Sequence, residues 1–273
     1  MTSSLVGSEM CIRDRVYIMI WTLSMRITIY VICFIFGIII GSFVNVLIYR
    51  LPLHENIVTE NSHCMTCGHK LKWYDLFPLF SYLFLRGKCR YCKAKLSVQY
   101  PLVEFINGLF YVLIFVFNGI NVTSICYVLS VSMLIALSVI DWRTYEIPFG
   151  LNIAILVFGI INMAFNYKNF LYYLIGMVCV SGFLLLLYLI TKGRGIGGGD
   201  IKLMAAAGLL LGWKHIILAL ILGCIIGSVI HIILMKVSDK GRMLAFGPYL
   251  SVGIVISMLC GDRLLNWYLG IFQ

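Results

Sequence analysis

Eight apolar runs, most of them close to 20 residues long, restrict this chain more than any other feature of its sequence. A helix needs about 20 apolar residues to cross the hydrocarbon core of a bilayer. Apolar residues make up 62% of the chain and charged residues 12%, whereas soluble domains are about half apolar and about a quarter charged. The runs are continuous rather than alternating, which favours helices over a barrel. We therefore expect an all-α polytopic membrane protein.

These runs predict about eight transmembrane helices. They lie at 27–49, 102–120, 122–140, 148–165, 170–190, 201–213, 216–235 and 244–260. The run 201–213 is the shortest. An α-helix rises about 1.5 Å per residue, so this run falls short of a hydrocarbon core roughly 30 Å thick. We expect this helix to be tilted into a cavity or half re-entrant.

A single long polar segment, 50–101, divides the chain. It comes after the first transmembrane span at 27–49 and precedes a membrane-embedded domain at 102–273. We expect it to be a small loop domain in the cytosol. Residues 1–26 are expected to form an N-terminal tail. The first fifteen residues are polar with mixed charge, unlike the apolar sequence after them, so the tail is interpreted as non-native in part.

The Lys and Arg residues support that orientation. With 50–101 in the cytosol and the sides alternating from there, fifteen of them lie on the cytosolic side, and Lys168, Lys214 and Arg263 lie on the other. The remaining three belong to the N-terminal tail and are left out of the comparison. Cytosolic loops of membrane proteins are enriched in Lys and Arg, so the asymmetry favours this topology. The same rule accounts for the net charge of +10. We expect contact with membrane lipid and no nucleic-acid partner.

Two Cys-x-x-Cys pairs lie within the polar segment. Cys64 and Cys67 are followed, after 21 residues, by Cys89 and Cys92. Each pair can chelate one metal ion through two thiolates, and two pairs complete the tetrahedron that zinc prefers. A reducing cytosol disfavours disulfides between them. The spacing predicts a structural zinc knuckle. A redox-active pair, and a ligand set in which a neighbouring histidine replaces one cysteine, are the weaker alternatives.

Two aspartates stand at the ends of apolar runs. Asp141 closes a run, where a helix C-terminus disfavours negative charge. Asp200 follows Gly197, Gly198 and Gly199, and glycines let the backbone approach another chain closely. Charged side chains beside a membrane span are functional candidates by default. Two carboxylates brought together share a proton, so one can activate water while the other polarises a carbonyl. From residue types alone, an aspartic dyad, an ion or proton relay and helix capping all remain open.

Five segments follow one another in a fixed order within residues 37–260. They are GSFVNVLIYRLP at 41–52, the stretch 73–104 with LRGKCR and YPLVE, DWRTYEIP at 141–148, GGGDIKL at 197–203 and FGPY at 246–249. Together they resemble the signatures of prepilin peptidases, the type IV leader peptidases among the G-x-G-D membrane aspartic proteases. Five linked motifs make a chance match improbable.

The resemblance implies a function and assigns site residues. The residues concerned are Asp141 and Asp200 as the catalytic pair, Gly197, Gly198, Gly199 and Lys202 as support for the substrate or the loop, and Cys64, Cys67, Cys89 and Cys92 as zinc ligands. The implied protein is an aspartic endopeptidase of the bacterial inner membrane. It cleaves the basic leader from prepilin or pseudopilin precursors, of type IV pilus or type II secretion systems, at the cytosolic face. Family members that carry the knuckle often also N-methylate the new N-terminus with S-adenosylmethionine, which we expect here.

Two departures and two rival functions accompany the resemblance. Met65 stands where proline is often found, and Phe149 stands where an acidic residue usually follows Ile-Pro, which leaves the local charge near Asp141 open. A presenilin-like intramembrane protease would share the G-x-G-D motif, but the knuckle argues against it. An ion- or proton-coupled transporter could use Asp141 and Asp200, although no inverted repeat is evident.

Overall fold

The computed structural model describes residues 3–57, 63–64, 66–70, 72, 78–193, 195–237 and 245–271, with side chains from residue 24 onward. Met65, Arg194, Lys240 and the first part of the 73–104 motif lie outside the described residues. The helices are α1 (Ser3–Arg50), α2 (Phe80–Phe84), α3 (Gln99–Asn118), α4 (Val122–Thr144), α5 (Phe149–Phe165), α6 (Phe170–Ile190), α7 (Gly198–Leu211), α8 (Trp213–Val237) and α9 (Gly247–Gly270). The described part contains no strand beyond two isolated β-bridges in the polar segment. The predicted all-α class is confirmed.

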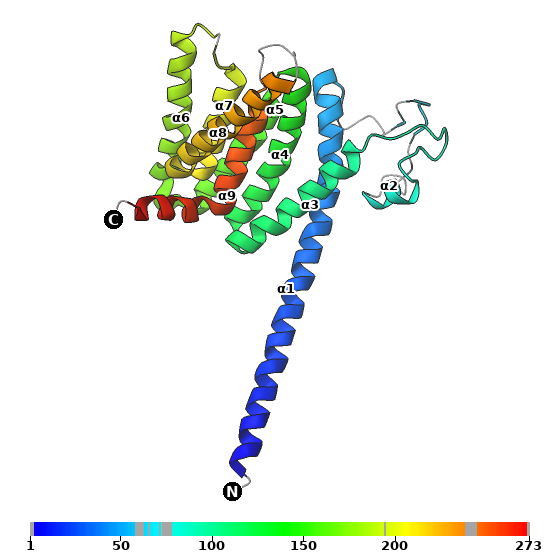
Figure 1. Ribbon diagram of the computed structural model, residues 1–273, viewed down its shortest axis with the longest axis vertical. Coiled ribbons are helices and arrows are strands. Elements are labelled where there is room, and N and C mark those ends of the chain that lie inside the picture. The colour runs from blue at the N-terminus through cyan, green and yellow to red at the C-terminus, as the bar shows by residue number, and fades with distance from the viewer. Residues whose placement is uncertain are drawn as a thin grey trace.

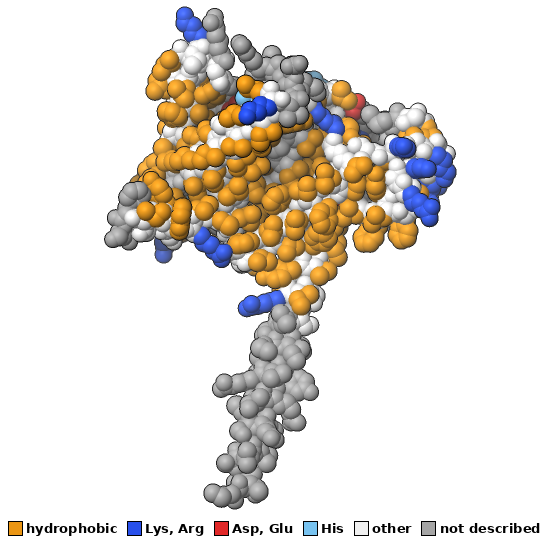
Figure 2. All heavy atoms as spheres, in the orientation of Figure 1, with side chains coloured by type: hydrophobic (Ala, Val, Ile, Leu, Met, Phe, Trp, Pro, Cys, Tyr) orange, Lys and Arg blue, Asp and Glu red, His pale blue; other side chains and the backbone are white. Residues whose placement is uncertain are grey.

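Each predicted apolar run coincides with a helix over most of its described residues. Six helices are long and apolar enough to cross a membrane: the stretch Ser24–Leu53, α3, α4, the stretch Tyr167–Ile190, α8 and α9. Helix α5 has 17 residues and α7 has 14, so both fall short of that length. Figure 2 shows apolar side chains covering the flanks of the helical bundle, while Lys and Arg gather on the polar segment. These features indicate a multi-pass membrane architecture.

Helix α1 begins far earlier than the sequence predicted. Its backbone is helical from Ser3, where we expected a tail up to residue 26, and its first half extends away from the bundle (Figure 1). The first proline of the chain is Pro52. No residue before it lacks the backbone N–H or blocks the preceding turn, so the helical hydrogen bonds continue without a break.

Glycines let α1 and α3 approach each other closely. A Cβ atom on Gly37 would come within 2.7 Å of the Gly108 Cα atom, and a Cβ atom on Gly41 within 2.8 Å of the Glu104 Cα atom. Real side chains cannot occupy that space. Small residues at helix interfaces maximise backbone packing in membranes, where no hydrophobic effect drives the helices together. The two glycines of the first span therefore fix the seam to α3.

Polar side chains inside the bundle are paired across helices. The Asn107 side chain in α3 donates to the Gly37 carbonyl of α1 at 2.6 Å and accepts from the Ser132 hydroxyl of α4 at 2.9 Å. Asn162 in α5 donates to the Leu210 carbonyl of α7 at 2.9 Å. Such hydrogen bonds hold helices together in a medium that offers no water as an alternative partner.

The ends of several helices meet on the side of the bundle that carries the polar segment. The C-terminal end of α1, the turn between α4 and α5, and the start of α7 lie at that end (Figure 1). The start of α9 joins them, because the Gly247 backbone N–H donates to the Asp141 side chain of α4. Residues far apart in the sequence are thereby collected at one end of the membrane domain.

Candidate functional site

Asp141 lies in the last turn of α4 and is buried, with 4% of its surface exposed. The Gly247 backbone N–H donates to its Oδ2 atom at 2.9 Å. A Cβ atom at position 247 would stand 2.7 Å from the same oxygen. The first residue of α9 must therefore be glycine for its N–H to reach the carboxylate.

Asp200 lies in the first turn of α7 and is 7% exposed. Gly197 is the N-cap residue of this helix, and its backbone N–H faces the Asp200 carboxylate. A helix N-terminus stabilises negative charge there. The Oδ1 atom of Asp200 has no partner among the described residues. One carboxylate oxygen is thus held in place and the other is available to a water molecule or a substrate.

The two aspartates are both buried and lie within electrostatic range of each other. The Asp141 carboxylate is near enough to act electrostatically on Asp200. Like charges at short range in a buried site favour a state in which one carboxyl holds a proton. Such a pair can accept a proton from water with one group and donate to a carbonyl oxygen with the other. The structure brings together the two acids that the sequence singled out.

The three glycines before Asp200 differ in their surroundings. A Cβ atom on Gly199 would come within 2.9 Å of the Ile147 Cβ atom, and one on Gly197 within 3.2 Å of the Asp200 Oδ2 atom. Gly198 has open space around it. Gly199 therefore permits α7 to approach the turn before α5, and Gly197 leaves room for the Asp200 carboxylate, whereas nothing in the described structure requires a glycine at 198.

The Lys202 side chain lies over the ring of Phe149. Its Nζ atom lies 5.0 Å from the centroid of the Phe149 ring, and both side chains are exposed. A lysine ammonium over an aromatic face is attracted by the ring quadrupole. Phe149 thus offers Lys202 an aromatic partner at the position where the resemblance led us to expect an acid.

The four knuckle cysteines converge. Their Sγ atoms all lie within 4.8 Å of one another, and those of Cys64 and Cys92 are 3.8 Å apart. Zinc–sulfur bonds of ~2.3 Å in a tetrahedron would separate the sulfur atoms by about 3.8 Å. Backbone N–H groups of Cys67 and Thr66 lower the pKa of the Cys64 thiol to about 6, which favours the thiolate that metals bind. The cluster can hold a metal ion, and its donor set and spacing fit zinc.

The two halves of the knuckle form the same short turn. The Cys64 N–H donates to the His69 carbonyl at 3.0 Å, and the Cys89 N–H donates to the Ala94 carbonyl at 2.8 Å. A β-bridge closes each turn, His63 with Lys70 and Lys88 with Lys95. The first cysteine of each pair is buried and the second exposed. Each half presents its two thiols in the same way, so the halves can close on one ion.

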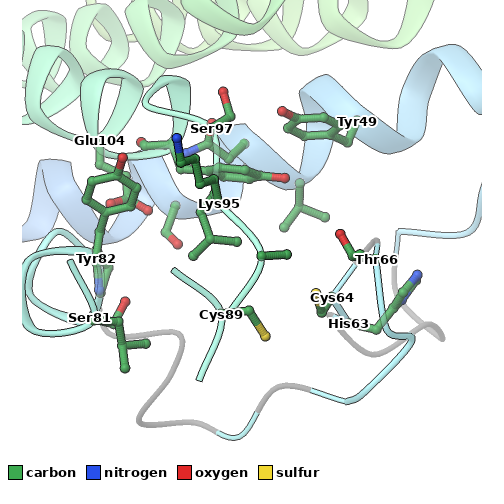
Figure 3. Close-up of a pocket in the computed structure, with 18 of the residues that line it drawn as sticks. Tyr49, His63, Cys64, Thr66, Ser81, Tyr82, Cys89, Lys95, Ser97 and Glu104 are labelled. Carbon is green, nitrogen blue, oxygen red and sulfur yellow. The ribbon is translucent and has the colours of Figure 1, made fainter. Parts of the chain in front are cut away.

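A pocket lies between the knuckle, α1 and α3, with a cavity of about 390 Å³ (Figure 3). Tyr49 and Tyr100 line it with rings stacked at 5.2 Å between centroids and 13° between planes. Glu104 also lines it, although it is only 7% exposed, and its Oε2 atom accepts from the Leu79 N–H at 2.8 Å. Figure 3 shows Tyr82 beside Glu104 at one end of the pocket and Tyr49 at the other.

Arg143 connects this pocket with the two aspartates. It comes two residues after Asp141 in α4, and its guanidinium carbon lies 5.1 Å from the centroid of the Tyr49 ring. The same guanidinium donates to the Gln99 side chain at the start of α3. The acid pair and the pocket are therefore neighbours across one arginine.

Sequence reasoning did not assign roles to Gly247 or Asn45. Gly247 belongs to the FGPY segment and Asn45 to the GSFVNV segment, so the motifs contained both residues. Gly247 contacts Asp141 of α4, and the Asn45 side chain of α1 donates to the Tyr100 carbonyl of α3 at 3.0 Å. No local pattern reveals such contacts between helices. The only sequence signal was their place within these motifs.

Comparisons with known proteins agree with this geometry. Residues 35–117 match the Bacterial Peptidase A24 N-terminal domain, and residues 127–232 match the type IV leader peptidase family. Three similar proteins are all named prepilin leader peptidase/N-methyltransferase. That of Aeromonas salmonicida (strain A449) is 32% identical over 270 residues, covering 86% of this chain and 92% of the relative. That of Pseudomonas putida is 33% identical, covering 84% and 90%, and that of Bacillus subtilis (strain 168) is 32% identical, covering 87% and 97%.

No solved structure matches the chain. The relatives nevertheless extend over both the polar segment and the membrane domain, and they cover most of their own length as well. The order of the five sequence motifs, the paired buried acids and these matches all point the same way. The chain belongs to the type IV leader peptidase family.

Proposed function

We propose that this protein cleaves the basic leader peptide from prepilin or pseudopilin precursors, with Asp141 and Asp200 as an aspartic dyad. The observation that carries the proposal is the shared burial of these two carboxylates at the end of the bundle that bears the polar segment. The names of the relatives supply the substrate class. The site lies at the cytosolic face of the bacterial inner membrane, where a leader preceding a hydrophobic helix would be presented.

The dyad performs hydrolysis without a metal ligand or a hydroxyl nucleophile among its own groups. One carboxylate accepts a proton from water, and the water oxygen attacks the scissile carbonyl carbon. The other carboxyl group donates its proton to the carbonyl oxygen. The tetrahedral intermediate then collapses: the carbon–nitrogen bond breaks, the leaving amine takes up the proton that the first carboxylate had accepted from water, and the second carboxylate regains its proton from the intermediate's hydroxyl group. The Gly247 N–H holds Asp141 in place, and the N-terminus of α7 stabilises charge on Asp200.

We propose a structural zinc ion in the knuckle and a second, methyl-transferring activity. The knuckle domain spans 50–101 and the peptidase domain 102–273. Few apolar side chains of the polar segment are buried, so this segment has little hydrophobic core. A metal ion bound by Cys64, Cys67, Cys89 and Cys92 would stabilise its fold instead.

The relatives' names include N-methyltransferase, and S-adenosylmethionine supplies an activated methyl group to such enzymes. The new N-terminus, an amine, is the acceptor.

Leader cleavage by acid variants tests the dyad. Asp141→Asn and Asp200→Asn should each lower the cleavage rate by at least roughly 10²–10⁴, because proton transfer alone contributes that much. The double variant should be little slower than either single variant, since residues that act as a unit are strongly non-additive. The assay is incubation of the purified protein with a prepilin, followed by mass spectrometry of the new N-terminus.

Glu146→Gln is the matched control. Glu146 is exposed at the same end of the bundle and should retain most activity. Near wild-type cleavage by Asp141→Asn would remove the dyad from consideration. If no variant of the two acids affected cleavage, an ion- or proton-coupled transporter that uses the same residues would become the better explanation. Cleavage inside a transmembrane helix instead of after a leader would favour a presenilin-like protease.

A further inference from the structure

A buried asparagine of α5 lies close to the dyad and has no protein partner in the described structure. Asn152 is 4% exposed, yet neither its Nδ2 atom nor its Oδ1 atom makes a hydrogen bond among the described residues. We propose that Asn152 is a positioning residue of the peptidase reaction, which holds a buried water molecule against the Oδ1 atom of Asp200. This inference rests on the proposed dyad and adds a third side chain to it.

The other buried asparagine of α5 is fully paired. Its side chain donates to the Leu210 carbonyl of α7 at 2.9 Å and accepts from the Thr123 hydroxyl of α4 at 2.8 Å. Four buried residues spaced three or four apart place both asparagines on one face of the helix: Asn152, Ile155, Gly159 and Asn162. A polar side chain inside a membrane domain is costly unless it is paired. Asn152 lacks the protein contacts of Asn162, so it needs a partner of another kind.

The shared face of α5 packs against α7, which carries Asp200. A Cβ atom on Gly159 would stand 3.1 Å from the Leu210 backbone nitrogen, so these two residues are level with each other. Both helices begin at the dyad end of the bundle and run in the same direction (Figure 1). Asn152 precedes Gly159 by seven residues, as Leu203 precedes Leu210, so Asn152 is level with Leu203. Leu203 follows Asp200 by three residues, which is about 4.5 Å along the helix axis at roughly 1.5 Å per residue.

The direction of the Asn152 side chain reduces this separation. The Cα–Cβ bond of a helical residue tilts toward the N-terminus of its helix, and the N-terminus of α5 lies at the dyad end. The Oδ1 atom of Asp200 is itself buried and has no partner among the described residues. Buried water molecules make roughly three hydrogen bonds each, to polar groups that the protein leaves unpaired. Two such groups within about one helical turn of each other can therefore share a water molecule.

Water fits these atoms better than a cation or the substrate does. An amide offers a donor and an acceptor, whereas a carboxylate offers acceptors alone. One water molecule accepts from the Asn152 Nδ2 atom and donates to Asp200, and a second can donate to the Asn152 Oδ1 atom. A cation would leave the Nδ2 atom unpaired. Asn152 lies deeper in the bundle than Asp200 and is buried, so a peptide bound at the dyad does not reach it.

The proposed water completes the support of the Asp200 carboxylate. Its Oδ2 atom lies beside Gly197, whose backbone N–H faces the carboxylate, and the water would hold the Oδ1 atom. A carboxylate oxygen can accept two hydrogen bonds, so Oδ1 remains able to meet the attacking water as well. A group held at both oxygens keeps the geometry that proton transfer requires, and a misplacement of about 1 Å can cost on the order of 10² in rate.

Substitutions at Asn152 in the full-length protein in detergent test the proposal. Asn152→Leu should lower the kcat of leader cleavage by roughly 10- to 100-fold. Its KM should not change, because the buried water touches Asp200 and not the substrate. Its unfolding temperature should stay the same or rise, because leucine removes an amide that the protein itself does not pair. Asn152→Ser should recover most of the lost kcat, since a shorter hydroxyl side chain binds water and leaves space for it.

Asn162→Leu is the matched control. It makes the same chemical change on the same face of α5, but it breaks hydrogen bonds to α4 and α7. It should lower the unfolding temperature and leave the kcat of the folded protein unchanged. A high-resolution structure of the wild type provides a measurement without any variant. It should show an ordered water within about 2.7–3.2 Å of both the Asn152 side chain and the Asp200 Oδ1 atom.

Three results would overturn the proposal. A raised KM with unchanged kcat in Asn152→Leu would make Asn152 a substrate contact. A fall in unfolding temperature as large as that of Asn162→Leu, with unchanged kcat, would make its role structural. Density in which no water joins Asn152 to Asp200 would remove the proposed bridge. Asp141→Asn is assayed in parallel: wild-type cleavage by that variant would refute the dyad, whereas its inactivity together with wild-type kcat in Asn152→Leu would refute the role of Asn152 alone.

Discussion

At the scale of single residues, the contact between Gly247 and Asp141 ties the last helix to the acid pair. The Gly247 N–H is the only hydrogen-bond donor that the described structure gives to the Asp141 carboxylate. It holds the Oδ2 atom of Asp141 at the start of α9. Any side chain at position 247 would displace that carboxylate or the start of α9.

Gly247→Ala should therefore impair catalysis more than folding. The new Cβ atom would stand 2.7 Å from the Asp141 Oδ2 atom, and misplacing a reacting group by about 1 Å can cost on the order of 10² in rate. We expect a loss of that order in leader cleavage with little change in the amount of folded protein. The measurement is the cleavage rate of purified variants matched for thermal stability.

Gly150→Ala is the companion variant. Gly150 lies in the first turn of α5, and a Cβ atom there would meet nothing within 4 Å. It should cleave as the wild type does. Equal activity of both alanine variants would show that the Asp141 carboxylate is not held by this contact.

The sequence predicted which residues are chemically unusual, but not how they are held. Asp141 and Asp200 could be selected because acids beside apolar runs are rare, and both are indeed buried at helix ends. The donor to Asp141 comes from a residue 106 positions later in the chain. A backbone N–H leaves no trace in composition or spacing, so only the tertiary structure could assign it.

At the scale of elements, the knuckle repeats a short turn that strains its backbone differently in each half. Gly68 follows the first pair with φ of 67°, and Lys93 follows the second with φ of 60°. Positive φ suits glycine and is unfavourable for a lysine. The His69 and Tyr91 rings, with centroids 3.7 Å apart, join the halves. A metal ion shared between the halves would compensate for the strain at Lys93.

Purified protein should contain one zinc ion per chain, and Cys89→Ser should lower that content. Cys89 is buried within the sulfur cluster, and three remaining thiolates leave the tetrahedron incomplete. Because the ion is proposed to be structural, the variant should unfold at lower temperature before the chemistry of the dyad is affected. Elemental analysis by mass spectrometry measures the metal.

Cys179→Ser provides the comparison for that experiment. Cys179 is an exposed cysteine of α6, outside the cluster, and its replacement should leave the zinc content unchanged. A wild-type protein that is folded and active without metal would contradict the structural role.

The seam between α6 and α7 depends on backbone contact. A Cβ atom on Gly176 would approach the Gly208 carbonyl oxygen to 2.5 Å, and one on Gly208 would approach the Gly176 carbonyl oxygen to 2.2 Å. Neither atom can move without moving its helix. Since α7 carries Asp200, this seam also sets the position of one member of the dyad.

Gly176→Ala should lower the stability of the protein by about 1–3 kcal/mol, the usual cost of forcing extra volume into a packed interface. Gly182→Ala, in the same helix, meets nothing closer than 3.8 Å and should be neutral or slightly stabilising, because alanine favours helix more than glycine does. Thermal unfolding in one detergent compares the two. Equal unfolding temperatures would mean that the helices are not packed this closely.

Element boundaries could be predicted where composition changes sharply. The run 170–190 coincides with α6 (Phe170–Ile190), because polar residues flank it on both sides. Helix α9 continues to Gly270 although the predicted run stopped at 260. Asp262 and Arg263 interrupt the apolar pattern there, although both residues lie within the helix. The apolar run therefore ended earlier than the helix does.

At the scale of the whole molecule, the helices connect two chemically different ends. One end holds the dyad, the pocket and the knuckle. At the other, the Tyr172 hydroxyl contacts the His215 Nδ1 atom at 2.8 Å, and the His215 Nε2 atom lies 3.1 Å from the Asp262 Oδ1 atom. These three residues come from the start of α6, the start of α8 and the last third of α9. The order of the helices in the bundle could not be predicted, because an apolar run shows no preference for particular neighbours.

Helix α7 connects those two ends. It begins at Gly198, two residues before Asp200, and ends at Leu211, four residues before His215. At about 1.5 Å per residue, 14 residues bridge roughly 21 Å, less than a bilayer core of roughly 30 Å. Its interior is nevertheless buried by α5, α6 and α8, so the lipid does not have to match its length.

A topology map of the protein in its membrane should therefore place Lys88 and Arg143 in the cytosol and Lys168 and Lys214 outside. Each crossing reverses the side, and α7 counts as a crossing because it joins the dyad to the cluster around His215. Reporter fusions or cysteine accessibility at these four positions show on which side of the membrane each one lies. Arg194 and Lys240, which lie outside the described residues, are also predicted to be cytosolic. Lys214 reached from the cytosol would show that α7 is re-entrant and that the bundle has fewer crossings. Lys168 on the side of Arg143 would show that α5 does not cross, and the assignment of the dyad to the cytosolic face would then rest on α4 alone.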